Sequence, residues 1–261
     1  MADVSCYTII SRDVELLAWC IDNARQRAGI DHSWHVIGWE PTDEVQKWCE
    51  SEGIPIYSFA PKEKSLFADH TSWFLHSLYT GWNMGYAVAE TKWVARMGSD
   101  QFFSNDWLLN LLEAAENHGE RGIYHTWTVE SPAAVHSRHP IMQWGSVHQL
   151  FNDRQFDLYA NDMIHRAGSA KAVRGDECDL FYRHPYRGKQ RRPDGVTWLQ
   201  TKALWEEFGP LDDNLNHEGV TGDVAYMDRI SDAGVRLWLV PRSVSYHLVQ
   251  GETRQEALKT L

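Results

Sequence analysis

Two carboxylates and one histidine stand where regular elements are expected to begin or end. Asp100 closes the run Gly98-Ser99-Asp100 after a short apolar segment, Asp223 precedes a helical pattern, and His247 ends the last apolar segment. Carboxylate oxygens and imidazole nitrogens bind divalent cations, and a carboxylate can also remove a proton from a hydroxyl. Each residue also has a simpler interpretation: a cap for Asp100 and Asp223, and a hydrogen-bonded surface residue for His247.

Apolar segments alternate with amphipathic ones over the first 118 residues. Strands are expected at 4–11, 34–39, 54–59 and 92–97, and helices at 13–27, 42–49, 72–89 and 105–118. Asp13 and Thr42 are the expected N-caps of the first two helices. This alternation is typical of βαβ units and predicts an α/β fold with a Rossmann-like, mostly parallel sheet flanked by helices.

The carboxyl ends of parallel strands form the edge where open sheets bind ligands. On the expected elements, this edge carries Ser11 and Arg12 after the first strand, Glu40 after the second and Asp100 after the fourth. His247, at the end of the last strand, shares it. The sequence therefore predicts a polar binding site at this edge of the sheet.

The second half of the chain is less regular. Residues 119–194 contain several turn signals and no clear period, which indicates an irregular insertion. Order returns with strands expected at 196–199, 235–240 and 243–248 and helices at 201–208 and 223–233. We expect one domain over residues 1–261, with halves 1–118 and 119–261.

Composition excludes several classes of protein. The chain has 261 residues, 43% of them hydrophobic, and a formal net charge of −11, which is typical of a globular domain and argues against a polyanion as general partner. No apolar stretch is long enough to span a membrane, and no signal peptide is visible. The four cysteines form no CxxC pair, so we expect reduced cysteines and a cytoplasmic protein.

Five motifs in this order resemble GT-A glycosyltransferases, especially the family-2-like group. Residues 92–112 resemble the strand–DxD–helix segment of these enzymes, and Asn83-x-Gly85 resembles the N-x-G pattern before it. Residues 208–213 resemble the G-G-F-D-E turn, and two later segments resemble the E-D-x-x-x-x-x-R and V-x-H motifs: 222–229 and 244–247. The resemblance covers about 240 residues and is weakest between 119 and 194. It implies the GT-A fold, with residues 1–118 as the nucleotide-sugar half and 119–261 as the acceptor half.

The resemblance also assigns roles to single residues. Asp100 matches the metal-binding acid of the DxD motif, and His247 matches a contact to the metal or the diphosphate. Asp223 matches the general base of inverting members. Gly98 and Gly222 stand where the family often has further acids. The implied donor-binding residues are Ser11, Arg12, Glu40, Asn83, Ser99 and Asp100.

The implied reaction moves a sugar from a nucleotide-sugar, with a UDP-sugar as first choice, to an acceptor hydroxyl. A divalent ion, Mn²⁺ or Mg²⁺, offsets the charge that develops on the leaving diphosphate. A carboxylate removes the proton of the attacking hydroxyl. A single base opposite the leaving group suits inversion, although related folds also catalyse retention.

The acceptor is open between a glycan, a protein and a hydroxylated DNA base. Residues 182–194 are strongly basic, and two tyrosines stand among the cations Arg183, Arg187, Lys189, Arg191 and Arg192. Interleaved arginine and aromatic residues suit flipped or single-stranded bases. The stretch equally suits a lid over the donor or a solvated loop. His136 and His139 lack further ligands at zinc-site spacing and are interpreted as surface or acceptor-loop residues.

One other function is consistent with the sequence, and two more are disfavoured by it. A non-catalytic descendant that binds a sugar nucleotide or a glycan would explain Gly98 and Gly222. A nucleotidyltransferase shares the sheet but normally has a Gly-rich phosphate loop after the first strand, which residues 11–15 lack. A dinucleotide oxidoreductase is disfavoured because no G-x-G-x-x-G follows any expected strand.

Overall fold

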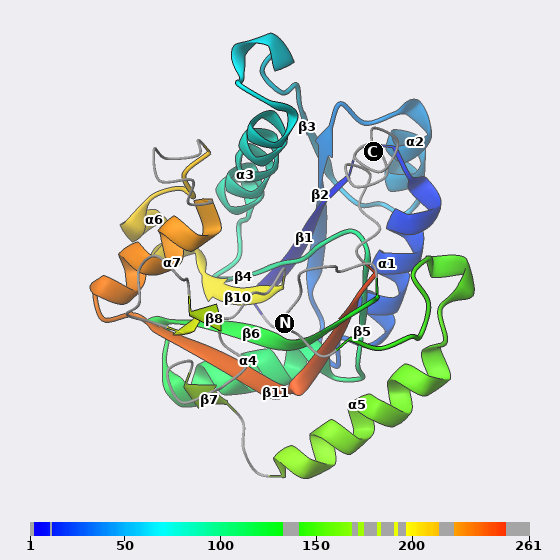
Figure 1. The fold of residues 1–261 in the computed structure, drawn as a ribbon, viewed down its shortest axis with the longest axis vertical. Coiled ribbons are helices and arrows are strands. Elements are labelled where there is room, and N and C mark those ends of the chain that lie inside the picture. Colours follow the sequence, from blue (N-terminus) through cyan, green and yellow to red (C-terminus); the bar gives the residue numbers. More distant parts are fainter. Residues whose placement is uncertain are drawn as a thin grey trace.

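The computed structural model describes residues 3–10, 12–132, 141–168, 172–174, 182–183, 191–192, 197–213 and 222–248. This part of the chain forms a nine-stranded sheet with helices on both faces (Figure 1). The strand order is β3-β2-β1-β4-β10-β6-β11-β5, and β7 pairs with β11 outside this path. A separate pair joins β8 (Tyr182–Arg183) to β9 (Arg191–Arg192).

The first half of the sheet confirms the predicted βαβ pattern. The strands β1 (Val4–Ile10), β2 (Ser33–Trp39), β3 (Ile56–Phe59) and β4 (Trp93–Arg96) are parallel neighbours. They alternate with α1 (Val14–Gln26), α2 (Asp43–Ser51) and α3 (His70–Val88). Asp13 and Thr42 cap α1 and α2 as expected, each accepting a hydrogen bond from a backbone N–H in the first turn.

The second half makes the sheet mixed rather than mostly parallel. β10 (Trp198–Thr201) runs antiparallel to both β4 and β6 (Gly122–Glu130). β11 (Arg236–His247) is parallel to β6 but antiparallel to β5 (Gln101–Phe103) and β7 (Val173–Arg174). The side-chain pattern of a strand does not encode its direction, which is why the sequence missed this mixture.

Two further predictions need correction. Residues 119–194 are not uniformly irregular, because they contain the central strand β6 and the helix α5 (Asp153–Ala167). The two strands expected at 235–240 and 243–248 form one strand, β11, with a register shift between Val240 and Val244. The pattern of α5 was weak because the helix buries only Phe156 and Ala160.

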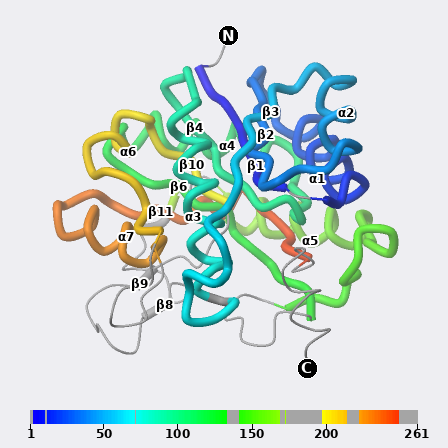
Figure 2. Tube along the Cα trace, turned by 90° about the horizontal axis from the view of Figure 1, so that it is seen from above, coloured from blue at the N-terminus to red at the C-terminus, as the bar shows by residue number. Residues whose placement is uncertain are grey.

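Helices cover the two faces of the sheet as separate layers. The first face packs against α1, α2 and α4 (Trp107–His118), and the other against α3, α6 (Lys202–Phe208) and α7 (Gly222–Asp232). The side chains of successive strand residues point to opposite faces of the sheet. Cys6 therefore packs in the core on the first face and Tyr7 in the core on the other. Seen from above, α6 and α7 lie on one side of α3, and α1, α2 and α5 on the other (Figure 2).

Short 3₁₀ helices lie at Lys64–Leu66 (η1) and His148–Leu150 (η2). None of the helices in the described residues is both long and apolar enough to cross a membrane. Cys6, Cys20 and Cys49 are buried and free, whereas Cys178 lies outside the described residues.

Candidate functional site

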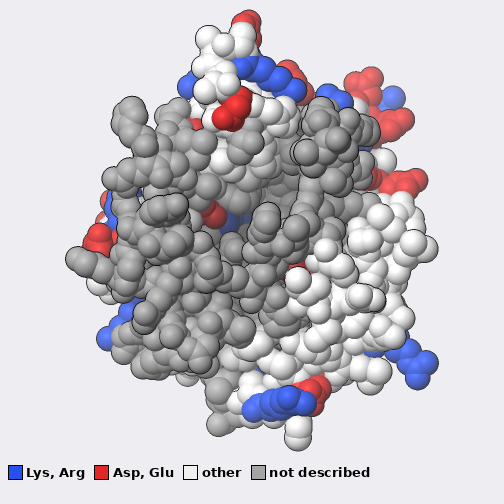
Figure 3. Space-filling view, viewed as in Figure 1, with Lys and Arg blue, Asp and Glu red and all other residues white. Residues whose placement is uncertain are grey.

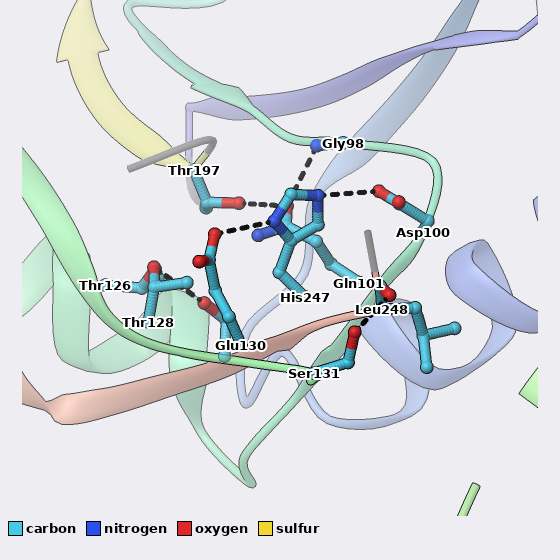
Figure 4. Close-up of polar contacts among 11 residues, drawn as sticks. Gly98, Asp100, Gln101, Thr126, Thr128, Glu130, Ser131, Thr197, His247 and Leu248 are labelled. Atoms are coloured by element: carbon cyan, nitrogen blue, oxygen red, sulfur yellow. Dashed lines mark hydrogen bonds and ion pairs between the residues drawn. The ribbon is translucent and has the colours of Figure 1, made fainter. Parts of the chain in front are cut away.

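Three strand ends bring Asp100, Glu130 and His247 together at the predicted edge of the sheet. His247 is the last residue of β11, and its neighbours in register are Glu130 on β6 and Gln101 on β5. Asp100 immediately precedes β5. Its Oδ1 lies 3.3 Å from His247 Nε2, and Glu130 Oε1 lies 3.1 Å from His247 Nδ1 (Figure 4). The ring is therefore held between two carboxylates.

The three side chains are mostly shielded from solvent. Their exposed fractions are 7% for Asp100, 14% for Glu130 and 16% for His247. Burial disfavours the charged ring, but the carboxylates of Asp100 and Glu130 outweigh this effect and raise the pKa of His247 to about 10. Without a bound cation, the two carboxylates therefore favour the protonated ring.

The turn that carries Asp100 is fixed by hydrogen bonds on several sides. The Gly98 N–H donates to Gln101 Oε1 over 2.8 Å, and the Cys20 thiol donates to the Gly98 carbonyl over 3.3 Å. The Leu248 N–H donates to the Asp100 carbonyl over 3.0 Å. This turn therefore holds a set position relative to the end of β11.

Asp100 and His247 fit a divalent cation as a pair of neighbouring ligands. Their facing atoms are 3.3 Å apart, and adjacent ligands of an octahedral ion at about 2.1 Å lie about 3 Å apart. A carboxylate and an imidazole together suit a transition-metal ion such as Mn²⁺. Among the described residues, no group of three His, Cys, Asp or Glu side chains is arranged to hold a metal ion. Asp100 and His247 would thus be the two ligands that the described residues supply.

Asp223 lies in the first turn of α7, across from α3. Tyr79 donates a hydrogen bond from its hydroxyl to Asp223 Oδ1 over 2.9 Å. The Val224 N–H donates to the same oxygen over 2.8 Å. These two bonds orient the carboxylate. The face of the molecule seen in Figure 1 is hollowed near its middle, with acidic and basic atoms visible at depth (Figure 3).

One face of α3 holds the 211–213 segment in place. Residues His76, Thr80 and Asn83 follow helical spacing along this face. His76 Nδ1 lies 2.8 Å from the Asp213 carbonyl, and Thr80 donates to the Asp213 carboxylate over 3.5 Å. Asn83 exchanges two hydrogen bonds of 2.8 Å with the Leu211 backbone. The helix α3 therefore holds residues 211–213, which come before Asp223 in the chain.

Arg96, the last residue of β4, is fully buried next to the Asp223 region. Its guanidinium carbon lies 3.3 Å from the ring centroid of Trp198 and 3.5 Å from that of Trp82. Burial lowers the pKa of Arg96, while Tyr86, Tyr7 and Asp223 oppose this shift by stabilising the charged form. The charge of this buried cation therefore acts on the carboxylate of Asp223.

Comparisons with known proteins identify the fold that carries these residues. Residues 75–176 match the model of "Glycosyl transferase family 2", a segment that includes Asp100 and Glu130. A structure of GalNAc-T7 with UDP, GalNAc and Mn²⁺ aligns over 94% of the chain with a TM-score of 0.56 and 9% identity. The mannosyltransferase PcManGT from Pyrobaculum calidifontis, in complex with GDP-Man and Mn²⁺, aligns over 96% with a TM-score of 0.54 and 13% identity. The chain has the GT-A glycosyltransferase fold.

The chain covers 43% of the GalNAc-T7 structure and 58% of the PcManGT structure. No curated protein sequence matches it. The GT-A fold confirms the resemblance drawn from the motifs, although the chain is only 9% and 13% identical to these two structures.

The predicted donor-site residues other than Asp100 are Ser11, Arg12, Glu40, Asn83 and Ser99. Ser11 lies outside the described residues, and Arg12 and Glu40 are exposed beyond the ends of β1 and β2. Glu40 has a left-handed backbone with φ of 43°, which is uncommon for a residue with a side chain. Ser99 is half-buried in the turn before Asp100. The Asn83 amide is used by the Leu211 backbone, so its predicted contact with the donor stays a prediction.

The glycine at 222 has a clear physical reason. A Cβ at this position would collide with the Asp212 carbonyl oxygen and approach Tyr79 to 3.0 Å. The acid that the family often carries here therefore has no room in this GT-A fold.

Within the basic stretch 182–194, only the backbone of residues 182–183 and 191–192 is described. β8 and β9 pair within it, whereas the side chains of Arg183, Arg191 and Arg192 and all of 184–190 lie outside the described residues. His136 and His139 also lie outside. The predicted DNA acceptor finds no support in the comparisons, whose ligands are a nucleotide, a nucleotide-sugar, a sugar and Mn²⁺.

Sequence reasoning missed Glu130, Tyr79 and Arg96. The strand-end rule that found Asp100 and His247 also applies to Glu130, but residues 122–130 were not identified as a strand. Tyr79 and Arg96 are marked by no local motif, because their role depends on packing between α3, β4 and α7.

Proposed function

We propose that the protein is a nucleotide-sugar-dependent glycosyltransferase that transfers a sugar to an acceptor hydroxyl with inversion. The observation that carries this proposal is the pairing of Asp100 with His247 at the carboxyl edge of a GT-A fold. The matched family segment contains Asp100, and two structures of similar fold hold Mn²⁺ with UDP or with GDP-Man.

On the donor side, Asp100 and His247 would hold a divalent ion, with Mn²⁺ favoured by the mixed oxygen and nitrogen ligands. The bound ion supplies positive charge that stabilises the leaving nucleoside diphosphate. Gln101 and Cys20 hold the turn of Asp100 through Gly98, so the ligand oxygen is in place before the donor binds. Arg12, Glu40 and Ser99 lie around this edge and are the proposed donor contacts, with UDP as the first nucleotide to test.

On the acceptor side, Asp223 acts as the general base. Its carboxylate takes the proton of the acceptor hydroxyl while that oxygen forms the new bond to the sugar C1. The bond from C1 to the diphosphate breaks, and the nucleoside diphosphate leaves with the electron pair. The Tyr79 hydroxyl orients the carboxylate through Oδ1. One base opposite the leaving group gives inversion at C1.

Calorimetry with UDP-, GDP-, CMP- and dTDP-sugars, each with and without Mn²⁺, tests the donor site. We expect one nucleotide to bind with an affinity that rises strongly with Mn²⁺, and Asp100→Ala to abolish this rise. Asp213→Asn is the matched control, because Asp213 also contacts a histidine, but that histidine is His76 of α3 and not His247. If none of the donors binds, or if Asp100→Ala binds as the wild type does, the proposal is wrong.

A non-catalytic sugar-nucleotide-binding protein is the second candidate, because Gly98 and Gly222 replace two acids of the family pattern. Measurement of nucleoside diphosphate release from the bound donor separates the two functions. Release that depends on Mn²⁺ and is lost in Asp223→Asn supports the enzyme, whereas tight binding without release supports the binding protein.

A further inference from the structure

We propose that Glu130 is a positioning residue for the cation site: it fixes the orientation of the His247 ring so that Nε2 faces Asp100. This inference rests on the proposed function, because it assumes that His247 binds the cation. It adds to the site a residue that no motif marks and that reaches the cation only through His247.

The contact geometry assigns the two ring nitrogens to different partners. Glu130 Oε1 lies 3.1 Å from Nδ1, whereas Asp100 Oδ1 lies 3.3 Å from Nε2. In Figure 4, Glu130 and Asp100 approach the ring from opposite sides. A ring turned over about its Cβ–Cγ bond would place carbon atoms where the two nitrogens now lie and lose both contacts, so Glu130 favours the orientation in which Nε2 points to Asp100.

A histidine that binds a cation through one nitrogen carries its proton on the other. A carboxylate that accepts this proton fixes the tautomer and the ring orientation and makes the ligand nitrogen more basic. Glu130 is placed for this role, because its oxygen can accept the Nδ1 proton and leave Nε2 for the cation. Loss of such a partner typically lowers metal affinity by about 10- to 100-fold.

Buried hydroxyl groups hold the strands that place Glu130 opposite His247. Thr126 and Thr128 share one face of β6 with Glu130, and Ser245 shares one face of β11 with His247. Ser245 Oγ lies 2.8 Å from Thr126 Oγ1 and 3.3 Å from Thr128 Oγ1, and these three residues are at most 3% exposed. A one-residue slip of β11 would turn every side chain to the other face. Ser245 comes just after the register shift between Val240 and Val244 in the chain. Its hydroxyl contacts therefore favour the register that pairs Glu130 with His247.

The test measures Mn²⁺ binding directly, without substrate, by electron paramagnetic resonance titration of the whole protein. Glu130→Leu removes the acceptor while keeping similar volume, and Glu130→Gln keeps an acceptor oxygen but removes the charge. We expect the Kd for Mn²⁺ to rise about 10- to 100-fold in Glu130→Leu and by less in Glu130→Gln. Asp213→Asn, which removes the carboxylate beside His76, is expected to leave the Kd unchanged.

A second readout separates positioning from a structural role. The ¹⁵N NMR spectrum of the His247 ring with Mg²⁺ reports which nitrogen carries the proton. We expect an Nδ1 proton in the wild type and in Glu130→Gln, and a changed tautomer in Glu130→Leu. If Glu130→Leu does not fold, the Kd and spectrum of Glu130→Gln decide, because a Kd within twofold of wild type together with an Nε2 proton in both proteins overturns the proposal.

The same Mn²⁺ titration on Asp100→Ala and His247→Ala separates a failure of the cation site from a failure of the role of Glu130. If these variants lose Mn²⁺ binding and neither Glu130 variant changes the Kd, only the role of Glu130 is wrong. If Asp100→Ala and His247→Ala bind Mn²⁺ like the wild type, the cation site of the proposed function is itself wrong.

Discussion

The guanidinium of Arg96 lies over the indole of Trp198, with its central carbon 3.3 Å from the ring centroid. The same carbon lies 3.5 Å from the ring centroid of Trp82. Because Arg96 is fully buried, these aromatic faces replace much of the water that would otherwise surround its charge. The stack fixes the end of β4, from which the chain turns toward Asp100.

We therefore expect Arg96→Lys to destabilise the protein although it keeps the charge. A lysine ammonium cannot stack flat between two rings, and a desolvated cation–π contact contributes about 2 kcal/mol. Urea unfolding should show a loss of that order. Lys64→Met is the control, because the Lys64 ammonium lies 4.3 Å from the Trp73 centroid but on the surface, where the expected loss is below about 1 kcal/mol. Equal losses in the two variants would contradict this account of Arg96.

Asp223→Asn should lower kcat by about 10²-fold or more while leaving the donor Kd close to the wild-type value. The amide cannot take the acceptor proton, yet it keeps the shape of the side chain and can still accept from Tyr79. Steady-state kinetics and calorimetry with the same donor measure the two quantities. A kcat near that of the wild type would remove Asp223 as the base.

Gly222→Ala should destabilise the protein by about 1–3 kcal/mol, the usual range for an overpacked site. The added methyl group meets the Asp212 carbonyl, which is backbone and cannot move like the end of a side chain. Thermal unfolding of the variant measures this loss. For comparison, Gly53→Ala adds a methyl group that meets nothing within 4 Å, so its loss of about 1–2 kcal/mol reports the strain of a φ of 65° and not a collision. A Gly222→Ala variant as stable as the wild type would leave the missing family acid unexplained.

His35 should make stability depend on pH between about 4 and 6.5. Burial lowers the pKa of His35 from 6.5 to about 4, although the hydrogen bond to the Gly85 carbonyl opposes the shift. As pH falls below 6.5, the unfolded chain takes up the proton first, so stability is complete above this pH and is lost toward pH 4. The loss is about 3 kcal/mol, from 1.36 kcal/mol per pKa unit.

Urea unfolding of the wild type and His35→Phe at pH 7 and pH 4 isolates this contribution. Phenylalanine can keep the stacking on Tyr7, whose ring centroid lies 5.2 Å away, but it cannot titrate. The wild type should therefore lose about 3 kcal/mol more than the variant on acidification. The same loss in both proteins would show that His35 does not titrate as stated.

The features that the sequence predicts correctly are those that depend on short-range patterns. The caps Asp13 and Thr42 and the strands of the first half follow from short-range patterns, and strand ends placed Asp100 and His247 at one edge. Glu130 was missed because its meaning comes from the register between β6 and β11, which no single segment encodes. The direction of β10 was missed for the same reason: it is decided by pairing with β4 and β6.

The position of β10 has a consequence for the chain as a whole. Because β10 hydrogen-bonds to β4 on one side and to β6 on the other, the segments 1–118 and 119–261 share one continuous sheet. A chain cut between these segments would leave the inner strand β4 with an open row of backbone donors and acceptors. Such an edge pairs readily with other chains, so the separated segments would aggregate rather than fold. We therefore expect the segments 1–118 and 119–261 to fold only together.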